Sequence, residues 1–224
     1  NITNRRVKLS LVTMSCKRIG AGAYASVYAN NDKKKVYKVS KHYLFRELIF
    51  LRQCHHESLI SAPEFSISPH DESGELYTWR NSSGIILIMP LADGTLEDYL
   101  ERSAQPRRTF AYTMKIMVDV LIGIEYLHHH NIFHFDIKPD NILLFNMHSN
   151  QPQAKISDFN LSARRKWFIS TNLIGTNWYR SPEVMHTRKF GGFCDIWAWA
   201  STLYEIITGK AVLAGVKSNA LSRI

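Results

Sequence analysis

Residues 134–141, with the sequence His-Phe-Asp-Ile-Lys-Pro-Asp-Asn, place three kinds of reactive side chain close together. Asp136 supplies a carboxylate, Lys138 an ammonium group and Asn141 an amide oxygen. Transfer of a phosphoryl group needs a base that orients the accepting hydroxyl, a cation that neutralises the phosphate and an oxygen ligand for Mg²⁺. The segment therefore predicts a site for phosphoryl transfer.

The segments on either side of this loop predict a helix before it and a short strand after it. Residues 110–130 have the apolar spacing of a helix, and residues 142–144 form an apolar run. Residues 128–130 are three consecutive histidines at the end of the predicted helix. Because they are not spaced one helical turn apart, they favour a capped, solvated helix end over a metal site.

Other segments of the chain extend this pattern in a fixed order. They are a glycine-rich stretch, a lysine-bearing strand, a helical glutamate, Asp-Phe-Asn, Ser-Pro-Glu and Asp-Ile-Trp, at residues 18–28, 36–38, 47, 158–160, 181–183 and 195–197. Together with the loop at 134–141, they resemble the signatures of eukaryotic serine/threonine protein kinases. The resemblance covers roughly residues 16 to 216.

The resemblance implies an α+β, bilobal fold. Residues 1–89 would form a small β-rich N-lobe with one helix, residues 90–94 a hinge, and residues 95–224 a larger, mainly helical C-lobe that is truncated relative to the family. At 224 residues with 45 % hydrophobic content, the chain can bury a substantial core. In relatives, further helices carry an arginine partner for Glu183. Either the chain is truncated or this lobe is abbreviated, and an unpaired, partly buried Glu183 would cost about 3–5 kcal/mol.

The resemblance also implies that the cofactor is ATP with Mg²⁺, or with Mn²⁺ in its place. Asn141 and Asp158 would hold the metal, Met89 would lie beside the adenine, and the backbone of Leu91 and Ala92 would bond its edge. The expected nucleotide-binding residues are Gly20, Ala21, Gly22, Ala23, Val27, Val36, Lys38, Met89, Leu91, Ala92 and Leu143. Taken alone, the glycine-rich segment is equally compatible with an ordinary hairpin.

The expected catalytic residues are Asp136, Lys138, Lys38, Glu47 and Thr176. Asp136 would orient the substrate hydroxyl, and Lys138 would stabilise the transferring phosphoryl group. By resemblance, Thr176 would bridge these two side chains. Glu47 would pair with Lys38, although a solvated helix charge is the alternative.

The residues around Glu47 also predict a helix. Residues 42–54 show a helical stripe of Leu44, Leu48 and Leu51, to which we add Phe45. By resemblance, Leu51 would stack with Phe159 and His134 to link the lobes. Asp195 would accept hydrogen bonds from the backbone of the catalytic loop.

Two departures from the family pattern carry information about regulation. Phe135 replaces an arginine that reads a phosphate on the activation segment of many relatives, so activity should depend little on that phosphorylation. Asn160 replaces the glycine after Asp158 and Phe159, and asparagine tolerates left-handed backbone angles. The combination is similar to some kinases of large DNA viruses.

Several features bear on the substrate. Thr176 resembles the threonine that serine/threonine-specific kinases carry at this place. Residues 178–183 and 208–215 look like the corresponding segments of the cyclin-dependent and mitogen-activated group. This likeness suggests that proline follows the target residue of the substrate. The net charge of +9, with a basic cluster at 164–166, favours acidic or phosphorylated substrates, although solubilising charge is an equal alternative. The resemblance implies protein substrates and a regulatory protein partner.

Composition limits the remaining classes. No aromatic-basic interleaving typical of nucleic-acid modules occurs, so a nucleic-acid partner is not expected. The 3 cysteines lie far apart, which favours a reducing compartment. No apolar run is long enough to span a membrane, and residues 1–8 lack a secretory core. We expect an intracellular protein of the cytoplasm or nucleus, in a host cell if the protein is viral.

Three functions fit this pattern to different degrees. An active protein kinase is favoured. A pseudokinase that serves as a nucleotide-binding interaction module is disfavoured because Lys38, Asp136, Asn141 and Asp158 are all present. A small-molecule phosphotransferase is disfavoured by Thr176 and residues 181–183, which resemble elements of peptide recognition.

Overall fold

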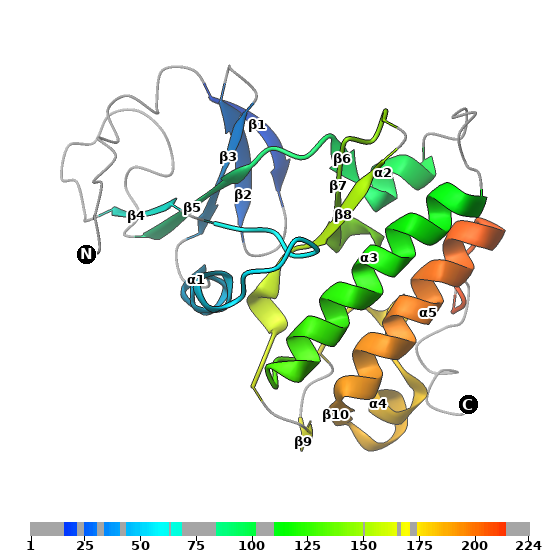
Figure 1. Cartoon of the computed structure of the whole chain (residues 1–224). Coiled ribbons are helices and arrows are strands. Elements are labelled where there is room, and N and C mark those ends of the chain that lie inside the picture. Colours follow the sequence, from blue (N-terminus) through cyan, green and yellow to red (C-terminus); the bar gives the residue numbers. More distant parts are fainter. Residues whose placement is uncertain are drawn as a thin grey trace. The chain divides into compact units, whose positions relative to one another are not determined.

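The chain folds into two compact units (Figure 1). The computed structural model describes residues 16–21, 25–30, 34–40, 44–62, 64–68, 84–101, 110–149, 151–164, 167–170 and 174–213. The first unit extends to Leu91 and the second begins at Ala92, except that Cys54–Ile60 belongs to the second unit. The predicted α+β fold, with one β-rich and one mainly helical part, is confirmed. The division falls inside the predicted hinge at 90–94, whereas the place of Cys54–Ile60 was not anticipated.

An antiparallel five-stranded sheet forms most of the first unit, in the order β1-β2-β3-β5-β4. Its elements are β1 (Cys16–Ala21), β2 (Ser26–Asn30), β3 (Lys35–Ser40), α1 (Leu44–Gln53), β4 (Glu64–Ser68) and β5 (Gly84–Pro90). Side chains alternate between the two faces of a strand, so Val36 and Lys38 of β3 share one face, and both are buried. The strand therefore brings its lysine to the same face as an apolar residue.

Helix α1 buries one face and exposes the other. Leu44, Glu47, Leu48 and Leu51 are buried at the spacing of a helical stripe. Phe45 is 62 % exposed, so its predicted place in this stripe is wrong. The reason is geometric, because the residue after Leu44 points about 100° further around the helix.

The second unit combines four α-helices with two small sheets among its described residues. The helices are α2 (Leu96–Glu101), α3 (Phe110–His129), α4 (Pro182–Thr187) and α5 (Gly192–Thr208). One sheet contains β6 (Gly94–Thr95), β7 (Ile142–Phe145) and β8 (Gln153–Ile156), and the other contains β9 (Trp167–Ile169) and β10 (Lys189–Gly191). Short 3₁₀ helices lie at η2 (Pro139–Asn141), η3 (Phe159–Leu161) and η4 (Asn177–Tyr179).

Helix α3 is the centre of this unit's core. Ile116, Met117, Val120, Ile124 and Leu127 are completely or almost completely buried along one side of it. The side chain of its Asp119 accepts a hydrogen bond from the backbone N–H of Ala154, which ties α3 to β8. Trp199 of α5 donates its indole N–H to the carbonyl oxygen of Met117, so α3 and α5 lie side by side (Figure 1).

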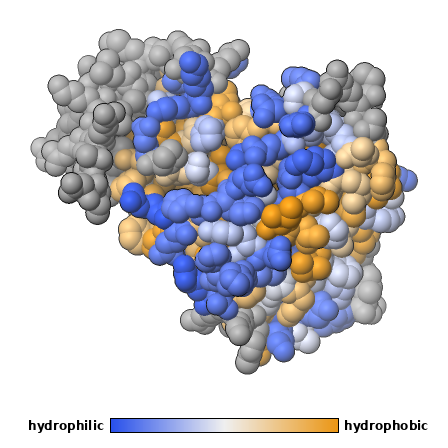
Figure 2. All heavy atoms as spheres, in the orientation of Figure 1, coloured by the Kyte–Doolittle hydropathy of each residue, from blue (hydrophilic) through white to orange (hydrophobic). Residues whose placement is uncertain are grey.

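A hydrophobic strip remains on the surface of these two helices. The exposed large apolar residues include Val118 and Ile122 of α3 and Ile196 and Ile207 of α5. Figure 2 shows hydrophobic surface over this region. Contiguous apolar surface of this kind is usually covered by another segment or by a partner. No helix within the described ranges has the length and apolar character needed to cross a membrane.

The carboxylate of Asp195 joins α5 to the catalytic loop, as the sequence predicted. It accepts hydrogen bonds from the backbone N–H groups of His134 (2.9 Å) and Phe135 (2.7 Å). Its Oδ2 also lies 2.9 Å from Nε2 of His128. Asp195 is 1 % exposed, so water cannot replace it as the acceptor for these two backbone N–H groups of the loop.

Removing this carboxylate should strongly destabilise the second unit. We expect Asp195→Ala to lower the free energy of unfolding by about 3 kcal/mol or more, because it leaves buried donors without an acceptor. Chemical denaturation with urea measures this loss. Asp93→Ala is the matched control, because Asp93 is exposed and accepts one backbone N–H, from Met147. Equal losses in both variants would contradict the role given to Asp195.

Candidate active site

In the first unit, Lys38 of β3 and Glu47 of α1 form the predicted ion pair. The Nζ of Lys38 lies 3.0 Å from Oε1 and 2.8 Å from Oε2 of Glu47. The side chain of Glu47 is 1 % exposed and that of Lys38 is 11 % exposed. Glu47 is therefore not a solvated helix charge. A buried carboxylate needs such a partner, so the pair fixes the position of the lysine ammonium group.

Part of the set predicted to bind the nucleotide lies on neighbouring strands of the first unit's sheet. Val27 of β2 pairs with Lys38 of β3, and Val36 of β3 pairs with Met89 of β5. Gly20 stands opposite Val27 at a register shift in the β1–β2 hairpin. Ala21 ends β1, whereas Gly22 and Ala23 lie outside the described residues. The predicted hairpin is therefore present, and its turn is not described.

The contact of the Leu91 backbone with the adenine edge stays a prediction, although one of its two backbone groups already has a partner. Its N–H donates to the carbonyl oxygen of Lys34 at 3.1 Å. Pro90 pairs with Lys35 but has no N–H. The backbone hydrogen bond between the ends of β3 and β5 is therefore made by the next residue, Leu91. The Leu91 N–H is therefore committed within the first unit. Ala92 is half-buried and begins the second unit.

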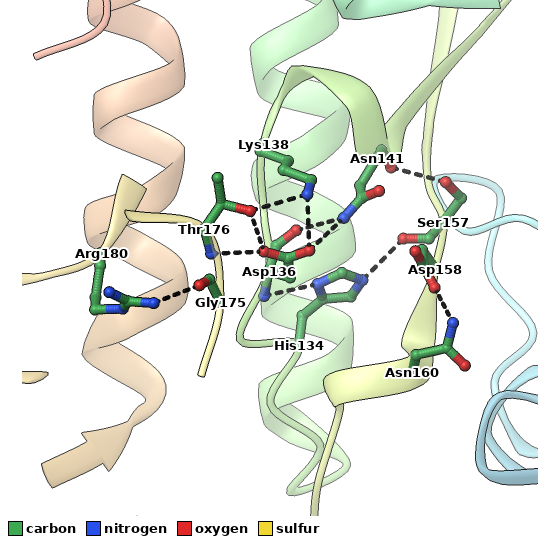
Figure 3. Close-up of polar contacts among 10 residues, drawn as sticks. All are labelled: His134, Asp136, Lys138, Asn141, Ser157, Asp158, Asn160, Gly175, Thr176 and Arg180. Atoms are coloured by element: carbon green, nitrogen blue, oxygen red, sulfur yellow. Dashed lines mark hydrogen bonds and ion pairs between the residues drawn. The ribbon is translucent and has the colours of Figure 1, made fainter. Parts of the chain in front are cut away.

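In the second unit, the carboxylate of Asp136 is surrounded by donors (Figure 3). Its Oδ1 accepts hydrogen bonds from the backbone N–H of Thr176 at 3.0 Å and from the hydroxyl of Thr176 at 2.9 Å. Its Oδ2 accepts from Nδ2 of Asn141 at 3.0 Å and pairs with Nζ of Lys138 at 3.1 Å. These contacts fix the carboxylate while leaving the residue only partly buried.

Thr176 connects the two charged groups of the loop. Its hydroxyl donates to Asp136 and accepts from Nζ of Lys138 at 2.9 Å. The bridge that the sequence predicted is therefore formed, although 38 residues separate Lys138 from Thr176. Both backbone and side chain of Thr176 contribute, so the segment carrying it is held against the catalytic loop.

Asn141 and Asp158 are brought close together by Ser157. The backbone N–H and hydroxyl of Ser157 both donate to the carbonyl oxygen of Asn141, at 2.9 and 3.0 Å. Asn141 uses its Nδ2 to donate to Asp136, so its side-chain Oδ1 is the atom suited to bind a cation. Within the described residues, no group of three or more His, Cys, Asp or Glu side chains could hold a metal. The amide and carboxylate oxygens fit Mg²⁺ that shares ligands with nucleotide phosphates.

Asn160 does not have the left-handed backbone that the sequence suggested. It lies in η3, and the left-handed residue is Asp158, with φ 65° and ψ 70°. The 3₁₀ turn begins directly after Asp158, so the unusual angles fall on the residue that precedes it. The side chain of Asn160 instead donates through Nδ2 to Oδ1 of Asp158 at 2.5 Å.

Two further predictions concern residues that support the site. The rings of His134 and Phe159 pack edge to face with centroids 5.1 Å apart, and both are completely buried. Leu51 belongs to the first unit, so its place in this stack stays a prediction. Leu143 is half-buried on β7, between the fully buried Ile142 and Leu144.

The sequence did not identify His128 as a structural partner. Its Nε2 lies 2.9 Å from Oδ2 of Asp195, so it is not part of a solvated helix end. His129 and His130 are exposed, as predicted. Only the packing of α3 against α5, which places Asp195 beside His128, distinguishes this histidine from its neighbours.

Arg180 and Gly175 are a second pair that sequence reasoning missed. The guanidinium of Arg180 donates to the carbonyl oxygens of Ile174 (3.0 Å) and Gly175 (2.5 Å), and it also contacts the side chain of Asn177. Gly175 has φ 80°, and an added Cβ would lie 2.6 Å from the carbonyl oxygen of Phe135. Glycine is therefore required where this segment meets the catalytic loop.

Tyr179 anchors the same segment to α5. Its hydroxyl donates to Oε2 of Glu205 at 2.6 Å. Burial, and then the hydrogen bond to Glu205, raise the pKa of Tyr179. The phenol therefore keeps its proton and remains a donor at neutral pH.

Phe135 lies in an aromatic cluster. It has φ 65° and is 6 % exposed. Its ring centroid lies 5.5 Å from that of Phe168 on β9 and 5.8 Å from that of Phe190 on β10. Phe168 and Phe190 are themselves stacked and paired across the two strands. Cys194 borders the cluster, and burial raises its pKa to about 11, so the thiol stays protonated.

The expected cost of a buried, unpaired Glu183 does not arise. Glu183 lies in the first turn of α4 and is exposed. A solvated carboxylate there needs no arginine partner, and it also suits the positive end of the helix.

This combination of fold and site corresponds to a known family. The family model for the protein kinase domain matches residues 14–223, and the chain belongs to this family. Cyclin-dependent kinase C-2 of Arabidopsis thaliana is 28 % identical over 223 residues, which cover 91 % of this chain and 42 % of that protein. Mitogen-activated protein kinase 14 of the same plant is 28 % identical over 215 residues, covering 90 % of this chain and 55 % of that protein.

A rice protein gives a similar result. Cyclin-dependent kinase C-1 of Oryza sativa subsp. japonica is 27 % identical over 223 residues, covering 89 % of this chain and 41 % of that protein. The chain thus spans about half the length of the curated relatives it matches.

Adding a methyl group at Gly175 should disrupt the contact with the catalytic loop. We expect Gly175→Ala to lower the free energy of unfolding by about 2–3 kcal/mol, because it combines a backbone clash with an unfavourable φ. Gly209→Ala is the control, since Gly209 has φ 73° but nothing within 4 Å of an added Cβ. The control should lose about 1 kcal/mol. Urea denaturation of both variants that gave the same loss would rule out the clash.

Proposed function

We propose that this domain transfers the γ-phosphate of ATP, bound with Mg²⁺, to serine or threonine hydroxyls of proteins. The observation that carries the proposal is the hydrogen-bonded group formed by Asp136, Lys138, Asn141 and Thr176. A carboxylate held by several donors can accept a hydrogen bond from a substrate hydroxyl in one defined orientation. The neighbouring ammonium group can stabilise charge on the phosphoryl group.

Each residue has a separate task in this proposal. Asp136 orients the hydroxyl and takes up its proton, while Lys138 neutralises charge beside it. Lys38, held by Glu47, binds the phosphates of the nucleotide. Asn141 and Asp158 hold Mg²⁺, which when bound neutralises the phosphate oxygens. The family membership and the printed names of the relatives support serine or threonine as the acceptor.

Substitution of Asp136 tests this function most simply. We expect Asp136→Asn to lower the rate of phosphate transfer from radiolabelled ATP to a peptide library by at least about 100-fold, because it removes the base. Asp140→Asn, an exposed residue of the same loop, should stay within about threefold of the unsubstituted chain. Nucleotide binding without any transfer by the unsubstituted chain would favour a pseudokinase instead.

We further propose that activity depends little on phosphorylation of the activation segment, residues 158–183. Phe135 stands where many relatives carry a phosphate-reading arginine, and it packs on Phe168 and Phe190 instead. Aromatic packing between buried rings contributes stability that needs no added charge. β9 and β10 are therefore joined to the catalytic loop by apolar contact.

Introducing the family's arginine at position 135 should destabilise this chain. We expect Phe135→Arg to lower the free energy of unfolding by about 3–5 kcal/mol, because it buries an unpaired charge among aromatic rings. Phe110→Arg is the control, since Phe110 is 75 % exposed, and its change should be within about 0.5 kcal/mol. Phosphatase treatment of the unsubstituted chain should leave its transfer rate within about twofold. A large loss of rate after dephosphorylation would overturn this part of the proposal.

We also propose a preference for proline after the target residue. The carbonyl oxygen of Gly175 is taken by the guanidinium of Arg180 and is not available to a substrate N–H. A substrate whose next residue has an N–H would leave that donor without a partner, at a cost of about 1–3 kcal/mol if buried. Proline has no N–H and avoids this cost.

Peptides with and without a backbone N–H on the residue after the serine test this explanation. We expect a Ser-Pro peptide to be phosphorylated with a kcat/KM about 10-fold or more above that of Ser-Ala. A peptide with N-methylalanine after the serine should also exceed Ser-Ala, because it lacks the N–H without carrying a proline ring. If N-methylalanine and alanine behave alike, the missing donor is not the cause.

The remaining partners and the location belong to the proposal as well. The net charge of +9 supports acidic protein substrates, and Arg164 of the basic cluster is exposed in the described part. All 3 cysteines are free thiols, which supports a reducing, intracellular location. A regulatory protein partner is proposed from the names of the cyclin-dependent relatives.

A further inference from the structure

Asn160 makes a direct contact with the carboxylate proposed to hold the metal. Its Nδ2 donates to Oδ1 of Asp158, and the acceptor is a charged carboxylate. Figure 3 shows the amide of Asn160 turned toward this carboxylate from η3. The two residues are separated only by Phe159, so the contact is local and depends on the turn that carries them.

The turn itself is held rigidly. Phe159 is completely buried against His134 of the catalytic loop. The N–H of Ser162 donates to the carbonyl oxygen of Phe159 at 3.1 Å and closes the 3₁₀ turn. Asn160 therefore cannot move far from Asp158 without disturbing a buried residue.

The amide has one productive orientation. Its Oδ1 is buried and has no hydrogen-bond partner. Exchanging the two ends of the amide would place this oxygen against the carboxylate oxygen of Asp158, which is electrostatically unfavourable. In the observed orientation Nδ2 therefore bonds Asp158, and Oδ1 is left without a partner.

We infer that Asn160 is a positioning residue for the metal ligand Asp158. Its donor fixes the rotation of the Asp158 carboxylate before a cation arrives, so less conformational freedom is lost on binding. The inference rests on the proposed function, since it requires that Asp158 binds the cation of a nucleotide. A glycine at this position, as in the family pattern, has no side chain and cannot make the contact.

Binding of Mn²⁺ in the presence of saturating ADP tests this role directly. Electron paramagnetic resonance of free Mn²⁺ gives the dissociation constant for the unsubstituted chain, Asn160→Gly and Asn160→Ala. We expect both variants to bind Mn²⁺ about 10-fold more weakly, because both remove the donor. Asn160→Ala keeps the Cβ, so it separates loss of the donor from gain of backbone freedom.

Two controls complete the design. Asn146→Gly makes the same exchange in an exposed turn with φ 54° and should leave Mn²⁺ affinity within about twofold. In transfer assays, the Mg²⁺ concentration for half-maximal rate should rise about 10-fold for Asn160→Ala, while kcat at saturating Mg²⁺ stays within about threefold. A purely structural role would lower kcat without this shift.

The outcomes distinguish a failure of the positioning role of Asn160 from a failure of the proposed function. If the unsubstituted chain binds Mn²⁺ with ADP and both Asn160 variants bind it equally well, the positioning role is overturned and the proposed function stands. If only Asn160→Gly is weakened, backbone freedom is the cause, and the inference is again overturned. If the unsubstituted chain binds no Mn²⁺ with ADP, the proposed function and the inference are both overturned.

Discussion

The carboxylate of Asp195 fixes the backbone of the catalytic loop, and the other contacts of the second unit build on this. It accepts the N–H groups of His134 and Phe135 from within α5, in a place that water does not reach. The left-handed backbone of Phe135 is thereby stabilised, and its carbonyl oxygen is presented to Gly175. That close approach brings Thr176 onto Asp136. One buried acceptor thus determines where a distant segment meets the loop.

The polar groups of the site are arranged so that each charge has a partner. Asp136 is balanced by Lys138 and Thr176, and Glu47 is balanced by Lys38. Such pairing offsets the cost of removing charges from water, and it also limits the orientations that the groups can take. The aromatic cluster of Phe135 adds apolar packing between the loop, β9 and β10. Hydrogen bonds and ion pairs thus orient the reacting groups, and packing adds to the contacts that hold the segments carrying them.

Motif order and spacing predicted the contacts that depend on residues within the family pattern. The pairing of Lys38 with Glu47, the bridge through Thr176 and the anchoring by Asp195 all followed from it. The failures have several physical causes. His128 could not be separated from its neighbours without the packing of α5. The prediction for Asn160 concerned its backbone angles, whereas its side chain makes the contact with Asp158.

The central claim is that this chain binds a magnesium nucleotide for phosphate transfer. Calorimetric titration with a non-hydrolysable ATP analogue and Mg²⁺ tests it most directly, on the unsubstituted chain, Lys38→Met and Asp158→Asn. The account predicts a dissociation constant below about 1 mM for the unsubstituted chain and about 10-fold weaker binding for each variant. No binding heat at millimolar nucleotide, or a heat that neither substitution changes, would contradict it.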